Sequence, residues 1–126
     1  MGMAKNTGQV CYGKFCLEVE VADTFLKKAL GLMFRSKLGE NKGILFLSRK
    51  ERIIPIWMLF TRIPLDVIWI NAEKRIVHIE RNLKPCRGLL CSPVYPKKPA
   101  KYVLEVNAGI SNKLEMREES VIDITD

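Results

Sequence analysis

Apolar and polar side chains alternate along several short stretches of the chain, and this period of two predicts β-strands. In residues 14–21, apolar side chains take every second position from Phe15 to Val21. Residues 10–12 predict a partner strand, separated from the first by Gly13. We expect these two strands to form a hairpin with a very short turn.

The most apolar stretch, residues 56–70, reads I-W-M-L-F-T-R-I-P-L-D-V-I-W-I. It is too apolar for a surface, yet Arg62, Pro64 and Asp66 interrupt it, whereas a membrane-spanning helix needs about 20 consecutive apolar residues. Pro64 has no N–H to give to a sheet and favours extended geometry in the residue before it. The pattern therefore predicts two buried strands joined at 61–64.

The remaining elements are short. Apolar positions at helical spacing predict one helix of about two turns from Phe25, capped by Asp23 or Thr24 and ended by Gly31. Further strands are expected at 44–47, 75–80, 101–107 and 121–124, a hairpin turn at 71–74, a helical turn from Ser111, and loops at 48–52 and 83–99. The fold class is mainly β, bordering on α+β: a small antiparallel β-sandwich or barrel with one short helix packed on the sheet.

Length and composition favour one domain over residues 1–126. A chain of 126 residues with 48% hydrophobic and 28% charged residues can bury a core of its own. The first ten residues lack the apolar segment of a secretory signal, so we expect a cytoplasmic protein. A single glutamine beside abundant Lys and Glu is typical of a thermophile.

The chain is basic, with 21 Lys and Arg against 14 Asp and Glu and a formal charge of +7. Most of the basic residues fall in expected turns and loops, where charge keeps a small domain soluble. No nucleic-acid motif is present and the aromatic residues lie within apolar runs, so we do not expect nucleic-acid binding. We also expect no membrane association, no cofactor and a monomer, with a small ligand or a protein as the partner class.

Four cysteines form two pairs with the same spacing, Cys11 with Cys16 and Cys86 with Cys91. Three alternatives stay open: a zinc site using all four, a Cys86–Cys91 disulfide, and independent thiols. Zinc knuckles use two to four intervening residues, so this spacing is at the limit. Intracellular chains keep thiols reduced except in hyperthermophiles, and independent thiols are therefore the main expectation.

Several separated motifs match a known pattern. They are Gly31-Leu32-Met33-Phe34-Arg35, Gly43-Ile44-Leu45-Phe46, Trp57-Met58 with Thr61, Ile63-Pro64-Leu65-Asp66, Pro85-Cys86, Cys91-Ser92-Pro93 with Tyr95, and Ala100 to Glu105 followed by Ala108-Gly109. Together they resemble the domain of unknown function 192, a family of small uncharacterised bacterial and archaeal proteins, over about residues 19–126. The resemblance implies a mainly β fold with a short helix and no established activity.

The chain departs from that family at one informative place. Where the family usually has Trp-Met-Lys-Asn-Thr, this sequence has Trp57-Met58-Leu59-Phe60-Thr61. A lysine and an asparagine are the polar pair that a ligand site or a catalytic site would use, and both are apolar here. A function that depends on an amine at position 59 therefore does not carry over.

Three residues form the candidate polar cluster: Arg35, Asp66 and Glu105. Asp66 begins an apolar strand and needs partners, because a buried carboxylate without them is costly. Arg35 would pair with it, or backbone N–H groups would. Asp66 and Glu105 could instead form an acid/base pair or a metal site, although no nucleophile–base motif accompanies them. The single histidine, His78, is expected to be structural or solvent-facing.

The leading hypothesis is a non-enzymatic binding or interaction module with its site at the 83–99 loop. Cys86, Cys91 and Tyr95 are the candidate binding residues of that loop, and Trp57 is an aromatic wall beside it. The first alternative is a small hydrolase or thiol-dependent enzyme using Asp66, Glu105 or Cys86. The second is a purely structural staple made by the two cysteines.

Overall fold

The computed structural model describes residues 7–22, 37–86 and 91–125. Its elements are β1 (Thr7–Tyr12), β2 (Phe15–Ala22), β3 (Lys42–Arg52), β4 (Leu65–Ile70), β5 (Ile76–Leu83), β6 (Ala100–Asn107), α2 (Ile110–Lys113) and β7 (Asp123–Thr125). The helix expected from Phe25 and the candidate residue Arg35 lie outside the described residues. The fold is the mainly β architecture that the sequence predicts.

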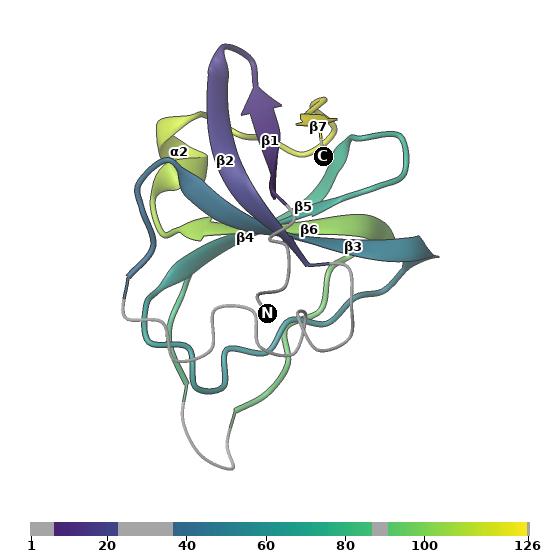
Figure 1. Cartoon of the computed structure of the whole chain (residues 1–126). Helices are drawn as coiled ribbons and strands as arrows, with labels where there is room; N and C mark the ends of the chain where they lie inside the picture. The colour runs from purple at the N-terminus through teal and green to yellow at the C-terminus, as the bar shows by residue number, and fades with distance from the viewer. Residues whose placement is uncertain (1–6, 23–36, 87–90, 126) are drawn as a thin grey trace, which may run out of the picture.

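The strands form one sheet in the order β5-β4-β6-β3-β2-β1-β7, antiparallel except for the parallel pair of β2 and β3. Backbone hydrogen bonds between the start of β5 and the segment before β7, such as Ile76 N to Ser120 O at 2.9 Å, bring the two edges together. The sheet therefore curls toward a barrel, and α2 lies at one end of it (Figure 1).

The inner face of the curled sheet holds the larger apolar cluster, here called the inner core. Its buried members are Val10, Leu17, Val19, Val21, Leu45, Ile68, Ile70, Ile76, Leu104, Val106, Ile110, Leu114, Met116 and Ile122. They come from six strands, α2 and the segment after it, because alternate residues of each strand point to the same face. The helical turn thus closes the barrel with apolar side chains.

The opposite face of β3, β4, β5 and β6 carries a second cluster, the outer core. Its buried members are Ala22, Ile44, Phe46, Ile56, Met58, Leu65, Val67, Trp69, Val77, Ala100 and Val103. Two segments without regular strands, 53–64 and 91–99, cover this face, and Figure 1 shows them in teal and green below the sheet. They position the candidate site.

Two expectations about strand boundaries are wrong. Residues 56–64 are not a strand; they make only isolated bridges, at Ile56, Leu59 and Thr61, while the second half of the apolar stretch is the fully buried β4. The stretch 48–52 is not a loop, because β3 continues to Arg52, which pairs with Ala100 after a register shift. These charged, exposed residues belong to β3 because the strand stays paired with β6 up to Arg52.

The turn between β4 and β5 confirms the expectation at 71–74. The side-chain oxygen of Asn71 accepts hydrogen bonds from the backbone N–H groups of Glu73 and Arg75, at 3.0 and 2.9 Å, and Lys74 has a positive φ of 63°. An Asx turn of this kind is what asparagine favours. No helix in the described residues is both long and apolar enough to cross a membrane.

Candidate functional site

Segments 53–57 and 93–95 run antiparallel and form what we call the aromatic ribbon. Ile56 and Val94 exchange two backbone hydrogen bonds, 2.9 and 2.8 Å long, and both side chains pack on the outer core. Trp57 follows Ile56 and Tyr95 follows Val94, so both point to the opposite side of the ribbon, away from the outer core. The ribbon thus has one face on the core and one face in solvent.

The solvent face of the ribbon is apolar. Trp57 is 55% exposed, Tyr95 59% and Ile53 42%, and the prolines Pro55 and Pro93 are exposed beside them. Phe60, 44% exposed, lies three residues beyond Trp57. Grouped exposed apolar side chains on a small protein mark an interaction site more often than isolated ones do.

Trp57 is held in place although its ring is exposed. Its indole Nε1–H donates to the carbonyl oxygen of Cys91 at 3.1 Å, and Cys91 is joined to Cys86 by a disulfide. Cys86 in turn donates its N–H to Met58 O (3.3 Å) and accepts from Phe60 N (3.2 Å). Trp57 and the residues that follow it are therefore tied to Cys91 and Cys86.

The four cysteines form two disulfides, Cys11–Cys16 and Cys86–Cys91. The expectation of independent thiols is wrong, and no zinc site uses all four. The first disulfide links directly opposed residues of the β1–β2 hairpin, since the turn has two residues, Gly13 and Lys14, rather than one. Gly13 has a φ of 59°, which suits the first position of such a turn.

Asp66 is almost fully buried, and its carboxylate accepts four hydrogen bonds. Oδ2 accepts from Gly109 N, Ser111 N and Ser111 Oγ at 3.0, 2.9 and 2.7 Å, and Oδ1 accepts from Asn82 N at 2.9 Å. Two of the donors are N–H groups at the start of α2, where a negative charge is favourable. Asp66 thus joins β4 to α2 and β5 by accepting backbone N–H bonds.

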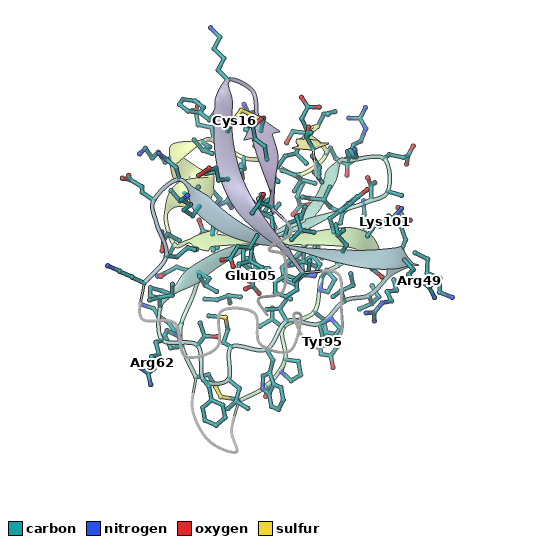
Figure 2. The ribbon with its side chains drawn as sticks, viewed as in Figure 1. Cys16, Arg49, Arg62, Tyr95, Lys101 and Glu105 are labelled. Carbon is teal, nitrogen blue, oxygen red and sulfur yellow. A yellow bond between two sulfur atoms is a disulfide. The ribbon has the colours of Figure 1, made fainter. Side chains whose placement is uncertain are left out.

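Glu105 does not meet Asp66. In the β4–β6 ladder Asp66 is opposite Val106 of the inner core, whereas Glu105 is opposite Val67 of the outer core, so the two carboxylates face opposite sides of the sheet. Figure 2 shows Glu105 at the middle of the sheet. Burial raises the pKa of Glu105 to about 7, and no described residue donates a hydrogen bond to its carboxyl group.

His78 is buried beside the ring of Trp69, with the ring centroids 5.2 Å apart. Its Nε2 lies 2.7 Å from Glu80 Oε2, and its buried Nδ1 has no partner among the described residues. These contacts suit the structural role expected for it. Within the described ranges, no three His, Cys, Asp or Glu side chains gather as metal ligands would.

A groove of about 720 Å³ runs along β1, β2 and the start of β3. It is lined by Thr7, Gly8, Gln9, Glu18, Val19, Glu20, Lys37, Leu38, Gly39, Lys42, Gly43 and Thr125. A Cβ at Gly43 would approach the carbonyl oxygen of Glu105 to 2.9 Å. The glycine is therefore needed for close packing of β3 on β6.

Sequence reasoning placed Tyr95, Cys86, Cys91 and Trp57 in one site, and the structure brings them to one side of the outer core. It did not find the outward-facing Ile53, Pro55 and Pro93. In residues 53–58 every side chain is apolar, so inward and outward positions look the same in the sequence. Alternate residues of an extended segment point to the same side, so an exposed Trp57 would have placed Pro55 on the solvent side too. Only the Ile56–Val94 pairing shows that Trp57 is exposed and that the segment is extended.

The comparisons with known proteins point to one family. A relative from Pyrococcus furiosus, a UPF0127 protein, is 39% identical over 101 residues, which is 79% of this chain and 80% of the relative. A UPF0127 protein from Thermococcus kodakarensis is 31% identical and covers 96% of this chain and 71% of its own length. Both relatives come from thermophilic archaea.

Two crystal structures have the same fold. One is a "putative transcription regulator" from Sinorhizobium meliloti, with a TM-score of 0.87, 26% identity and 98% of each chain covered. The other is a protein of unknown function from Novosphingobium aromaticivorans, with a TM-score of 0.83, 29% identity, and 93% of this chain and 83% of that chain covered. The profile of the DUF192 family, described as uncharacterized ACR, matches residues 8–124. The chain therefore belongs to the DUF192 family, whose archaeal members are named UPF0127 proteins.

Proposed function

We propose that the protein is a binding module and that the solvent face of the aromatic ribbon is its ligand site. The observation that carries this proposal is at Trp57, a residue that is 55% exposed while the polar atom of its side chain is fixed to Cys91 O. An exposed ring with restricted motion loses little conformational entropy when a ligand covers it. Aromatic side chains of this kind dominate binding energies at protein interfaces.

The support around Trp57 also favours binding. The Cys86–Cys91 disulfide and the backbone bonds of Cys86 hold the chain beneath the ring, and Ile56 and Val94 anchor the ribbon to the outer core. A site on a rigid support is more precise than one on an unsupported loop. The same disulfide also limits the unfolded chain, so a stapling role accompanies binding rather than replacing it.

The enzyme alternative has less support. Cys86 is held in a disulfide, the carboxylate of Asp66 is fully used by four donors, and Glu105 faces the other side of the sheet from Asp66. A hydrolase needs a nucleophile and a base within hydrogen-bond reach. Among the described residues these candidates do not form such a pair.

Intrinsic fluorescence offers a direct test, because the chain has two tryptophans and Trp69 is completely buried. We would titrate the protein with cellohexaose, a decaproline peptide and an oligothymidylate, the last because the Sinorhizobium relative carries the words "transcription regulator". At least one probe should change the emission of Trp57, and Tyr95→Ala should weaken that response about tenfold.

The matched control is Phe15→Ala. Phe15 is 57% exposed, like Trp57, but lies at the tip of the β1–β2 hairpin, so its removal should leave the titration unchanged. A response from none of the three probes, or one that Phe15→Ala weakens as much as Tyr95→Ala does, would overturn the proposal.

A further inference from the structure

The positive charge of the chain is concentrated in two stretches without acidic residues. Residues 52–65 and 81–104 contain eight of the 21 Lys and Arg and none of the 14 Asp and Glu. The eight are Arg52, Arg62, Arg81, Lys84, Arg87, Lys97, Lys98 and Lys101. Their formal charge of +8 exceeds the +7 of the whole chain, so the rest of the protein is close to neutral. These stretches contain both segments of the aromatic ribbon.

Exposed cations also stand at the end of the sheet from which the ribbon leaves. Segment 53–57 follows β3 directly, and Arg49, Lys50 and Arg52 at the end of β3 are all exposed. Figure 2 shows Arg49 and Lys101 at this end, with Tyr95 below them. Within the described residues, neither Arg49, Lys50 nor Lys101 has an acidic partner, whereas Lys97 and Lys98 pair with Glu118 and Glu119.

The two aromatic rings of the ribbon are spaced for neighbouring flat groups. Pro93 is opposite Trp57 in the antiparallel pairing set by Ile56 and Val94, so Tyr95 is the diagonal neighbour of Trp57 on the same face. Diagonal neighbours on a two-stranded ribbon are about 7–8 Å apart, a distance at which each ring can receive its own planar partner. Base–aromatic stacking needs only exposed ring faces of this kind.

We propose that the aromatic ribbon binds single-stranded nucleic acid, with bases stacked on Trp57 and Tyr95 and phosphates near Arg49, Lys50 and Lys101. This inference rests on the proposed function and names its ligand class. The sequence disfavours nucleic acid for two reasons: it has no nucleic-acid motif, and its aromatic residues lie within apolar runs. The exposed fractions of Trp57 and Tyr95, 55% and 59%, remove the second reason.

Other anionic partners fit less well. An acidic peptide would satisfy the cations but would leave the faces of Trp57 and Tyr95 without planar partners. A duplex hides its base faces in the stack, and the ribbon has no helix to enter a major groove. A single strand presents both groups at once, since its bases are free to unstack while its backbone stays charged.

The test uses fluorescein-labelled oligothymidylate of about 12 nucleotides at low salt, with fluorescence anisotropy as the readout. Trp57→Leu should weaken binding about tenfold, because one stacked base is lost. Tyr95→Leu should do the same, and Phe15→Leu should stay within about twofold of the wild type. Tyr95→Leu keeps the test valid if loss of the Trp57 hydrogen bond disturbs the ribbon. Equal affinities for all four proteins would overturn the proposal.

Salt dependence tests the cations separately. Each phosphate contact adds about 0.7 to the slope of log affinity against log salt for a single strand. Arg49→Ala and Lys101→Ala should each lower that slope, whereas Lys113→Ala should not, because Lys113 is the last residue of α2 and pairs with Glu40. Unchanged slopes in both Arg49→Ala and Lys101→Ala would exclude phosphate contacts at this end of the sheet.

Competitors separate the ligand classes. A 12-base-pair duplex and polyglutamate should each displace the labelled strand at least tenfold less well than unlabelled oligothymidylate. Equal competition by polyglutamate would mean recognition of negative charge alone and would overturn the nucleic-acid assignment. If oligothymidylate fails while cellohexaose or decaproline changes the Trp57 emission, the ligand class is wrong but the ribbon remains the site. If no probe acts there, both proposals fail.

Discussion

The two apolar layers of this protein, the inner core and the outer core, differ in how far their buried polar groups are hydrogen-bonded. In the inner layer, the buried carboxylate of Asp66 accepts four hydrogen bonds and organises α2 against β4. In the outer layer, Nδ1 of His78 has no hydrogen-bond partner among the described residues, and the carboxyl group of Glu105 is buried with a raised pKa. The outer layer also carries the ribbon with its exposed rings. Natural proteins depart from full satisfaction mainly where function requires it.

The difference suggests a division of work. The inner layer fills the curled sheet and is closed at one end by α2, and its side chains stabilise the fold. The outer layer is covered by backbone that pairs through isolated bridges, among them Ile56–Val94 and Leu59–Cys86. Backbone of this kind can expose apolar side chains that would be buried in a regular strand of the core. Each prediction below changes one layer and asks whether the other responds.

Removal of the Asp66 carboxylate should have the largest effect on stability. Asp66→Ala leaves the Ser111 hydroxyl and three backbone N–H groups, one buried and two partly buried, without their acceptor, so the free energy of unfolding should fall by about 3 kcal/mol. Urea denaturation measures the change. The exposed Asp123→Ala should change stability by less than about 0.5 kcal/mol. A small loss at Asp66 would mean that the inner layer does not depend on this carboxylate.

Glu105 should make the free energy of unfolding fall as the pH rises, because burial disfavours its charged form. Its pKa rises from 4.5 to about 7 on folding, so the folded chain holds this proton more tightly than the unfolded chain does. The stabilising contribution of the protonated form is complete below pH 4.5 and is lost as the pH rises through about 7. The loss amounts to about 3 kcal/mol.

Glu105→Gln tests this directly. Relative to the wild type, the variant should gain stability progressively between pH 4.5 and pH 7 and hold the gain above that range. Thermal denaturation across the range gives the difference at each pH. The exposed Glu115→Gln is the matched control for the change from glutamate to glutamine. A difference between Glu105→Gln and wild type that stays constant with pH would contradict the raised pKa.

The two disulfides should contribute equally to stability and unequally to binding. Both join residues with a sequence separation of 5, so each should restrict the unfolded chain by about 2 kcal/mol. The double variants Cys11→Ser/Cys16→Ser and Cys86→Ser/Cys91→Ser should therefore lose similar stability. Only the second should also weaken binding at the ribbon, because Cys91 O holds Trp57. Equal binding by both variants would show that Trp57 needs no such support.

Phe60 should give the smallest effect. Its φ of 61° is unfavourable for a residue with a Cβ, and Phe60→Gly should gain about 1 kcal/mol relative to Phe60→Ala, which keeps the strained backbone without the ring. Thermal denaturation of the two variants isolates the backbone cost. Asparagine, which the family resemblance expects here, also tolerates this conformation. Glycine and alanine variants of equal stability would show that the backbone relaxes.

Much of the fold was open to prediction because local signals coincide with burial. The continuous apolar run of β4, the Asn71 turn and the alternation in β2 each carry their own information. The β1–β2 hairpin was predicted, but with a one-residue turn. A turn at Gly13-Lys14 would have set Cys11 opposite Cys16 and predicted their disulfide.

The outer layer resisted prediction for a physical reason. Segment 53–58 contains no polar residue that would mark its solvent face. Which side chains point outward depends on the pairing of Ile56 with Val94, 38 positions further along the chain. The partners of Asp66 were equally hidden, since three of the four donors are backbone or side-chain groups of Gly109 and Ser111, more than 40 residues on. Long-range pairing, not local propensity, decides both.

Amide chemical-shift mapping with oligothymidylate would test the central claim most directly. In ¹H–¹⁵N spectra of the full chain, the account predicts shifts in residues 53–60 and 93–101, together with the indole N–H of Trp57. The hairpin tip around Phe15 and the groove beside Gly43 should stay unchanged. Shifts confined to the hairpin or the groove, with a silent Trp57 indole, would contradict the assignment of the aromatic ribbon as the binding site.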